Sequence, residues 1–428
     1  MLKKWYENFS AQPHQSFFAN GIILLVAFSA LLLGAYGGFF SLRADVTRYH
    51  AYAFIFVIFI QFFLGFLFVV FPKFLVQAAV KPEIYMAHFR LYFISSYGLF
   101  FSFLFGGDYS ALFFASLGLI AQIRSFSLLF SIYKRSVARD KYDSKWILIG
   151  LFCGLIFNSL YLAGSVFFSG FAELERLAIR GGFFLFLFVV VFAVSQRMIP
   201  FFTSVKVQGY VINKSKFLME KIFALLALKI LAEAFLPSAA FAADAMLFAV
   251  TAYEIYRWKL PLLGVNSILW ILYVSLYWIP IGFLLSFAQW LSEILELNLV
   301  FEKAPLHAFA LGYFFTILVG FGTRVTLGHS GRAPHADGMA TAIFVFTQAV
   351  VFSRIFAAFS LNLELSYSFF IELSLILFIC ALLVWGCRYL PTLIKGYNPS
   401  KPQPSEPKVG FSLKENKPTS SSAWKFKK

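Results

Sequence analysis

The stretch 17-FFANGIILLVAFSALLLGAYGGFF-40 decides the fold class of this protein. It is an almost unbroken apolar run of 24 residues. About 20 apolar residues, rising about 1.5 Å each in a helix, cross the hydrocarbon core of a bilayer. The run is longer than the apolar part of a signal peptide, and no small-residue cleavage site follows it. We therefore predict that this stretch is a membrane span retained in the mature protein.

Apolar runs of the same kind recur along the whole chain. Hydrophobic residues make up 60% of the 428 residues and charged residues only 13%, whereas soluble domains carry about 25% charged residues. We expect an all-α, polytopic membrane protein, a bundle of about twelve transmembrane helices. The predicted spans are residues 17–40, 50–71, 89–106, 109–133, 146–169, 180–199, 217–237, 239–257, 262–288, 305–327, 338–360 and 366–388.

Lys and Arg residues accumulate in alternate loops. If the N-terminus is inside, most of them lie on the cytoplasmic side, and the opposite loops carry Arg43, Arg48, Arg176, Arg180 and Lys303. Cytoplasmic loops of membrane proteins are enriched in Lys and Arg. The pattern therefore predicts that both termini are cytoplasmic. It also explains the net charge of +16 as topology and argues against nucleic-acid binding.

The chain divides into three predicted parts. Residues 1–16 form a cytoplasmic N-terminal segment, and residues 17–390 form the twelve-helix transmembrane domain. Residues 391–428 are a basic tail rich in Pro, Ser and Lys. Such a composition cannot bury a core, so we expect this tail to be disordered in the cytoplasm.

Three basic residues, Arg124, Lys229 and Arg354, fall inside predicted spans. Ionisable residues in a membrane are costly, and they either pair with one another or mark a pathway. Glu233 and Glu372 are the candidate carboxylate partners. Pairing predicts a structural role for the three residues, whereas a direct pathway role would be typical of a transporter.

Two of the six histidines, His50 and His307, each open a predicted span at the outer face. Two imidazoles at the same depth are candidate ligands of haem iron or copper. The other interpretation is that each is a hydrogen-bonded structural residue. His14 and His88 lie in cytoplasmic flanks, where we expect them to be solvated or interfacial.

A polar cluster closes the tenth span on the cytoplasmic side. His329 is 22 residues after His307, about 33 Å along a helix, so the two cannot share one metal. Together with Arg197, Arg324 and Arg332, His329 is a candidate seat for an anionic group such as a haem propionate or a phosphate. The alternative is that these residues cap helices and anchor the cytoplasmic side.

Two motifs carry a family resemblance. The stretches 197-RMIPFFT-203 and 306-LHAFALGYFFTILVGFGTRVTLGHSGR-332 resemble the NnrS family, over about residues 10–390. The resemblance implies a twelve-span protein of the bacterial inner membrane that contains haem and copper and is linked to nitric oxide metabolism. It also supports a cofactor-binding role for His50, His307, His329, Arg197, Arg324 and Arg332, with His50 and His307 as metal ligands.

The chain departs from the family pattern in two places. At 50-HAYA-53, Tyr52 and Ala53 stand where the family has a second histidine and a glutamate, so copper binding is in doubt. At 14-HQSFF-18 the family's arginine is missing.

We therefore expect a haem-binding protein, with copper uncertain, that acts in nitric oxide metabolism or protects against nitrosative stress. The bilayer, haem and nitric oxide are its expected partners. No acidic proton relay of the kind a reductase needs is visible in the sequence. This argues against a catalytic role in nitric oxide metabolism. The alternatives are a secondary transporter of a small solute, which would use Arg124, Lys229 and Arg354, and a haem or copper assembly factor for respiratory enzymes.

Overall fold

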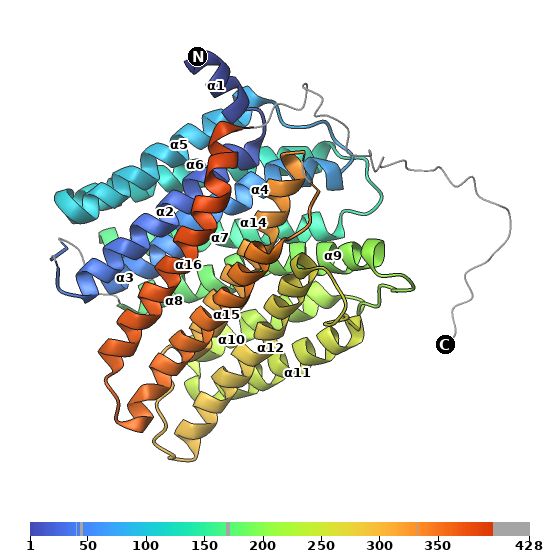
Figure 1. Ribbon diagram of the computed structural model, residues 1–428. Helices are drawn as coiled ribbons and strands as arrows, with labels where there is room; N and C mark the ends of the chain where they lie inside the picture. Colours follow the sequence, from blue (N-terminus) through green and yellow to red (C-terminus); the bar gives the residue numbers. More distant parts are fainter. Residues whose placement is uncertain (40, 43–45, 168–171, 332, 397–428) are drawn as a thin grey trace. The chain divides into compact units, whose positions relative to one another are not determined.

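The computed structural model describes residues 1–39, 41–42, 46–167, 172–331 and 333–396. Every regular element in this part of the chain is helical, as predicted (Figure 1). The α-helices are α1 (Leu2–Phe9), α2 (Pro13–Tyr36), α3 (Val46–Tyr52), α4 (Phe59–Phe74), α5 (Pro82–Phe101), α6 (Asp108–Arg135), α7 (Tyr142–Phe167), α8 (Ala172–Gly181), α9 (Val189–Lys206), α10 (Leu218–Phe235), α11 (Ala240–Trp258), α12 (Ser267–Ile294), α13 (Ala304–His307), α14 (Thr316–His329), α15 (Gly338–Phe359) and α16 (Tyr367–Lys395).

Six shorter segments have other helical geometries. Four are π-helical: η1 (Ala53–Ile58), η2 (Ser102–Gly106), η3 (Gly182–Phe188) and η5 (Ala308–Phe315). Two are 3-10 turns: η4 (Pro237–Ala239) and η6 (Ser360–Leu363). The segments η1, η3 and η5 each continue directly between two α-helices, so α3–η1–α4, α8–η3–α9 and α13–η5–α14 are single continuous rods.

Among the described residues, eleven helical segments are long and apolar enough to cross a membrane. The predicted span that is missing from this group is 217–237, which forms α10. This helix has 18 residues and contains four charged side chains, Glu220, Lys221, Lys229 and Glu233. The charged side chains of α10, and not its length, exclude it from the eleven apolar segments.

Helix α10 runs antiparallel to α11 over the same depth. The backbone N–H of Ser215, before α10, donates to Glu254 near the end of α11 at 2.8 Å. Towards the other end, the Lys229 ammonium is 2.7 Å from Asp244, near the start of α11. Because α11 is one of the eleven apolar segments, α10 passes back across the same thickness and is the twelfth helix of the bundle.

The ends of the helical domain differ slightly from the predicted limits. Residues 1–16 contain the short helix α1 and the first residues of α2, which begins at Pro13. Helix α16 continues to Lys395, so residues 391–395 belong to the bundle and not to a tail. The remainder of the predicted tail, 397–428, lies outside the described residues.

Local sequence explains several helix ends. Pro13 and Pro82 open α2 and α5, where proline fixes φ and its missing N–H costs no helical hydrogen bond. Asn266 and Asp337 cap α12 and α15 by accepting hydrogen bonds from the N–H groups of Ile268 and Ala340. Such side chains satisfy N–H groups that have no partner within the helix.

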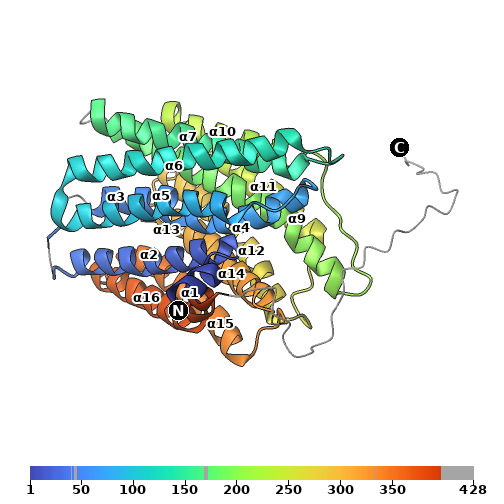
Figure 2. The same cartoon turned by 90° about the horizontal axis from the view of Figure 1, so that it is seen from above.

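Long helices far apart in the sequence lie side by side in the bundle (Figures 1 and 2). The first and last of them, α2 and α16, are neighbours in both views. We call the end where α2 begins and where α14 ends the basic end, because Lys73, Arg197 and Arg324 lie there. The other end, where α3 and α13 begin, is called the opposite end.

The three rod-forming π-helices meet in the interior. The rings of Phe56 in η1 and Phe186 in η3 are 6.1 Å apart, and those of Phe183 in η3 and Phe314 in η5 are 5.2 Å apart. All seven residues of η3 are buried. π-Helical turns are rare and often occur at functional sites. Here they lie beneath the turns that carry His50 and His307.

Candidate functional site

His50 and His307 lie at the opposite end, as the sequence predicts. His50 is in α3 and His307 is the last residue of α13, and each is followed within three residues by a π-helix. The two rings are within electrostatic range of each other. His50 also packs against Phe54, with ring centroids 4.8 Å apart. From the sequence, the two histidines are predicted only to lie at the same depth in the membrane. The folded chain also brings them near each other.

The hydrogen bond made by His307 shows which of its ring nitrogens carries the proton. Nδ1 of His307 lies 2.9 Å from the carbonyl oxygen of Lys303, one helical turn earlier. A carbonyl only accepts, so Nδ1 carries the proton and Nε2 has the lone pair. Metal-binding histidines are commonly held in this way by a backbone carbonyl. The ring of His307 is therefore oriented and protonated as a ligand would be.

Arg354 of α15 lies beside the histidine pair at the opposite end. Its guanidinium is within electrostatic range of both His50 and His307 and is hydrogen-bonded to Tyr367. Its Nη1 is buried without a hydrogen-bond partner among the described residues, and so is Nδ1 of His50. A buried donor without a partner is uncommon in folded proteins. Two imidazoles and a cation with a spare donor therefore share one site. The position of Arg354 within a predicted span does not by itself indicate that it lies beside the two histidines.

Tyr52 does not extend this site. Its hydroxyl donates to Asn158 of α7 at 3.1 Å, and its ring stacks on Tyr161 at 4.5 Å. Ala53 is fully buried at the start of η1. Positions 52 and 53 are therefore used for packing between α3 and α7. Neither residue can replace the second histidine and the glutamate of the family pattern.

A second pair of histidines lies at the basic end. The rings of His14 and His329 are 4.7 Å apart, and Lys73 is within electrostatic range of both. His14 is only 2% exposed, so the expectation that it is solvated or interfacial is wrong. It is buried because α2 already begins at Pro13, which places His14 on the first turn of a packed helix. His88 is also buried and contacts Ser125 Oγ at 3.1 Å, contrary to the same expectation.

Gln12 fixes the ring of His329. The side-chain amide nitrogen of Gln12 donates to the His329 carbonyl oxygen at 3.3 Å, and its Oε1 lies 2.7 Å from Nδ1 of His329. The first contact orients the amide, so Oε1 must accept from Nδ1–H. Nε2 of His329 is then the unprotonated nitrogen. Nδ1 of His14 is buried with no partner among the described residues.

The two arginines of the predicted anion seat that the structure describes, Arg197 and Arg324, differ in their partners. Arg197 pairs with the buried carboxylate of Asp143 at 2.9 Å and lies over the Phe74 ring at 4.1 Å. Its charge is therefore already neutralised. Arg332 lies outside the described residues. Sequence spacing does not reveal Asp143 as a partner of Arg197, because Asp143 lies 54 residues earlier and in another helix.

Arg324 confirms that the two family motifs pack together. Its guanidinium lies over the ring of Phe202 at 3.8 Å, and the rings of Phe202 and Phe321 are 6.3 Å apart. Helices α9 and α14 are thus neighbours at the basic end. No carboxylate partner of Arg324 occurs in the part of the chain that the structure describes.

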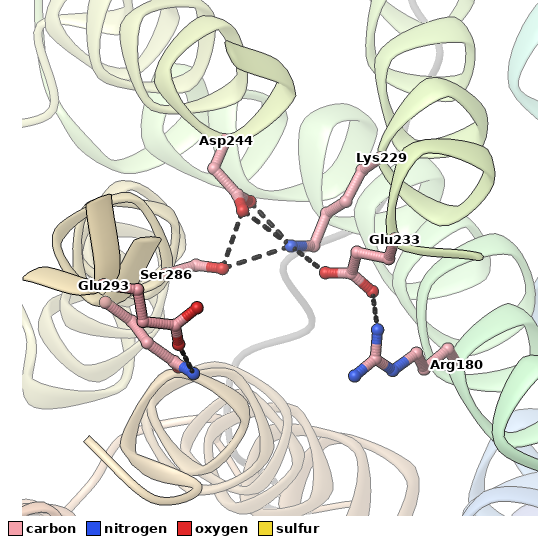
Figure 3. A network of polar contacts seen from close by, with 7 residues as sticks. Arg180, Lys229, Glu233, Asp244, Ser286 and Glu293 are labelled. Atoms are coloured by element: carbon pink, nitrogen blue, oxygen red, sulfur yellow. Dashed lines mark hydrogen bonds and ion pairs between the residues drawn. The ribbon is translucent and has the colours of Figure 1, made fainter. Parts of the chain in front are cut away.

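Lys229 belongs to a buried ionic network, which Figure 3 shows. Its ammonium contacts Asp244 at 2.7 and 2.9 Å, Glu233 at 2.6 Å and Ser286 at 3.1 Å. Glu233 also pairs with Arg180 at 2.5 Å. Two cations and two anions from α8, α10 and α11 therefore balance, which makes the burial of Lys229, Glu233 and Asp244 tolerable. The predicted pairing of Lys229 with Glu233 is confirmed, and Asp244 is an additional partner.

The three basic residues proposed for a transporter lie in different parts of the bundle. Lys229 is in the network on α10, Arg354 is beside the histidine pair on α15, and Arg124 is exposed on α6 near His88. They do not line a common cavity among those found in the described residues. This arrangement gives no support to a transport site built from these three residues.

The fold and both histidine pairs define an α-helical, polytopic membrane protein with polar sites at the two ends of its bundle. The family model of the NnrS protein matches residues 8–396. The chain therefore belongs to the NnrS family, whose members are membrane proteins linked to nitric oxide metabolism. A comparison with curated proteins finds no match.

Proposed function

We propose that this protein binds haem at the opposite end of the bundle and acts in nitric oxide metabolism or in protection against nitrosative stress at the bacterial inner membrane. The observation that carries the proposal is the convergence of His50, His307 and Arg354. Family membership supports it, because the chain matches the NnrS model over nearly its whole helical domain. The predicted sidedness places this site at the outer face.

The residues at this end fit the requirements of haem. His307 is held by the Lys303 carbonyl so that Nε2 has the lone pair, and His50 has a buried nitrogen without a partner among the described residues. Imidazole nitrogen is a common axial ligand of haem iron. The spare N–H of Arg354 suits a propionate, because a guanidinium binds carboxylates in a bidentate manner. These three side chains would hold the group.

When bound, haem would supply an iron centre that binds nitric oxide. The chain's own contribution is to position and shield that centre. The Lys303 carbonyl keeps the proton on Nδ1 of His307, and the packed π-helices η1 and η5 close the site towards the membrane interior. Apolar packing on that side would limit the access of water to the bound group from below.

The basic-end pair does not fit a haem held between its two rings. Metal–imidazole bonds are about 2.0–2.1 Å long, so two imidazole rings on opposite sides of one ion have their nitrogens about 4 Å apart and their centroids about 6 Å apart. The ring centroids of His14 and His329 are only 4.7 Å apart, which leaves no room for a porphyrin plane between the rings. The opposite end is therefore our proposed haem site, and His329 is not assigned to it.

Copper is not part of the proposal. No group of three or more His, Cys, Asp or Glu side chains able to hold a metal ion occurs in the described ranges. At positions 52 and 53, where the family pattern has further ligands, Tyr52 and Ala53 are used for packing. The side chains present do not fit a copper site of three or more protein ligands.

The optical spectrum of the purified protein tests the proposal. Expressed in haem-sufficient cells and purified in detergent, it should show a Soret band that is lost or much reduced in His307→Ala and in His50→Ala. The matched control is His335→Ala, since His335 is exposed and contacts Asn266 in a loop at the basic end. A haem-free purified protein, or full haem retention in both variants, would contradict the proposal.

A further inference from the structure

A small cavity, open on one side, lies in the bundle between the two histidine pairs. Its volume is about 70 Å³. Phe18 of α2, Phe59 of α4, Val194 of α9, Phe314 of η5 and Leu318 of α14 are among its lining residues, and all its described lining residues are apolar or glycine. The cavity is thus formed where five elements fail to fill the space between them.

The composition of the wall limits what can occupy the cavity. A buried water molecule needs about two to four polar partners, and cavities lined only by apolar side chains stay dry and accept apolar guests such as xenon. The volume is well below the about 300–1,000 Å³ of pockets for drug-sized ligands. The fitting occupant is therefore a small uncharged molecule with few atoms.

The cavity adjoins a histidine of the basic end and lies on the same helical rods as the histidines of the opposite end. Phe18 lines it and packs edge-on against His14, with ring centroids 6.1 Å apart. On the other side, Phe59 follows His50 by nine residues, or about 14 Å of helix. Phe314 lies in the π-helix that begins directly after His307. The cavity therefore lies about one helical turn from His14 and about two turns from His50 and His307.

We propose that this cavity binds a small apolar molecule of diatomic size that enters from the bilayer. Such molecules partition into apolar surroundings because water excludes them. Phe63, Phe66 and Phe321 line the cavity and are only half-buried, so their rings form the side through which a molecule passes from the lipid. That the physiological occupant is nitric oxide rests on the function proposed above. The existence of the binding site does not depend on that proposed function.

Xenon is the probe that tests the cavity. Crystals of the protein pressurised with xenon should show an anomalous peak bounded by Phe59, Val194 and Leu318. This experiment needs neither haem nor nitric oxide, so its failure is distinguishable from failure of the haem proposal. Absence of a xenon peak in the wild-type protein would overturn the inference.

Two substitutions fill the cavity to different extents. Val194→Phe adds a ring and Leu318→Phe adds less volume, and both side chains are less than a tenth exposed. Each variant should lose the xenon peak while keeping its thermal midpoint in detergent. If Val194→Phe does not fold, the presence or absence of the xenon peak in Leu318→Phe tests the proposal. A peak retained in a folded variant would show that xenon binds elsewhere and would overturn the proposal.

The matched control uses the same substitution on the outer surface. Val345 of α15 is 55% exposed and is not a lining residue of the cavity. Val345→Phe should keep the xenon peak at full occupancy. Loss of the peak in this control would show that the added ring acts through a general disturbance of the bundle, and that result would remove the support given by the filling variants.

Discussion

Nδ1 of His329 donates a 2.7 Å hydrogen bond to Oε1 of Gln12, a residue 317 positions earlier in the chain. The contact joins the start of α2 to the end of α14 and sets the protonated nitrogen of a histidine in the family motif. It makes the residues just before the first span part of the basic-end site. From sequence alone, residues 1–16 are predicted to be a separate cytoplasmic segment.

Replacement of Gln12 by leucine should destabilise the protein. The substitution leaves Nδ1–H of His329 without its acceptor, and the loss of one such hydrogen bond costs about 0.5–1.5 kcal/mol, or about 1–3 kcal/mol when the donor stays buried. Thermal unfolding in detergent would measure the effect. The control is Gln208→Leu, because Gln208 is exposed in the loop after α9. Equal midpoints for the two variants would contradict the role given to Gln12.

The helical architecture could be predicted from sequence because span length and loop charge each reflect the membrane directly. Periodicity and length alone place His50 and His307 at one end, since each opens a rod at the same face. The pairing of Lys229 with Glu233 was also accessible, because residues four apart share a helix face. These predictions depend on local spacing, which the folded chain preserves.

Other features depend on contacts between distant segments, and sequence spacing does not specify them. Asp143 neutralises Arg197 from another helix, and His14 is buried only because α2 begins before the apolar run. The π-helical segments have no distinct sequence signature, since their apolar residues read as ordinary span. These contacts decide which residues of the basic end remain available to a ligand.

Breaking the buried network at Lys229 should be strongly destabilising. In Lys229→Met, Asp244 keeps its burial but loses the ammonium, and an uncompensated buried charge typically costs about 3–5 kcal/mol. The double variant Lys229→Met/Asp244→Asn should recover much of the loss, because Glu233 still pairs with Arg180. Thermal or denaturant unfolding in detergent would measure both.

The exposed pair of Arg176 and Glu173 is the control for this prediction. Its side chains are 61% and 76% exposed, and surface ion pairs contribute only about 0–1 kcal/mol. Arg176→Met should therefore have little effect. If Lys229→Met were as mild as this control, the network would not be buried as described.

Asp337 should give the protein a pH-dependent contribution to stability. Its pKa is lowered below the usual 3.8, first by the hydrogen bond from the Ala340 N–H and then by the one from Arg388. A carboxyl whose pKa is lower in the folded state stabilises the protein above its unfolded pKa. That stability is lost as the pH falls through the folded pKa.

The substitution Asp337→Asn isolates this effect. Asparagine caps a helix about as well as aspartate, but its side chain does not titrate. The stability difference between wild type and variant should therefore be constant near neutral pH and should shrink as the pH falls below about 4. Thermal midpoints measured across this range provide the test. A difference that does not change with pH would contradict the assignment.

The close contact between η3 and η1 should make Gly182 intolerant of a side chain. A Cβ at Gly182 would lie only 2.4 Å from Cζ of Phe56, so Gly182→Ala forces the two π-helices apart. Overpacking of this kind costs about 1–3 kcal/mol. Because η1 directly follows the turn that carries His50, occupancy of the proposed haem site should fall together with stability. Gly328→Ala is the control, since a Cβ at Gly328 would meet no atom within 4 Å. Alanine in a helix is favoured over glycine by up to about 1 kcal/mol, so this variant should not be destabilised. Thermal unfolding and the Soret absorbance of the two purified variants would separate the outcomes. A Gly182→Ala protein as stable as Gly328→Ala would show that the π-helices do not pack against each other this closely.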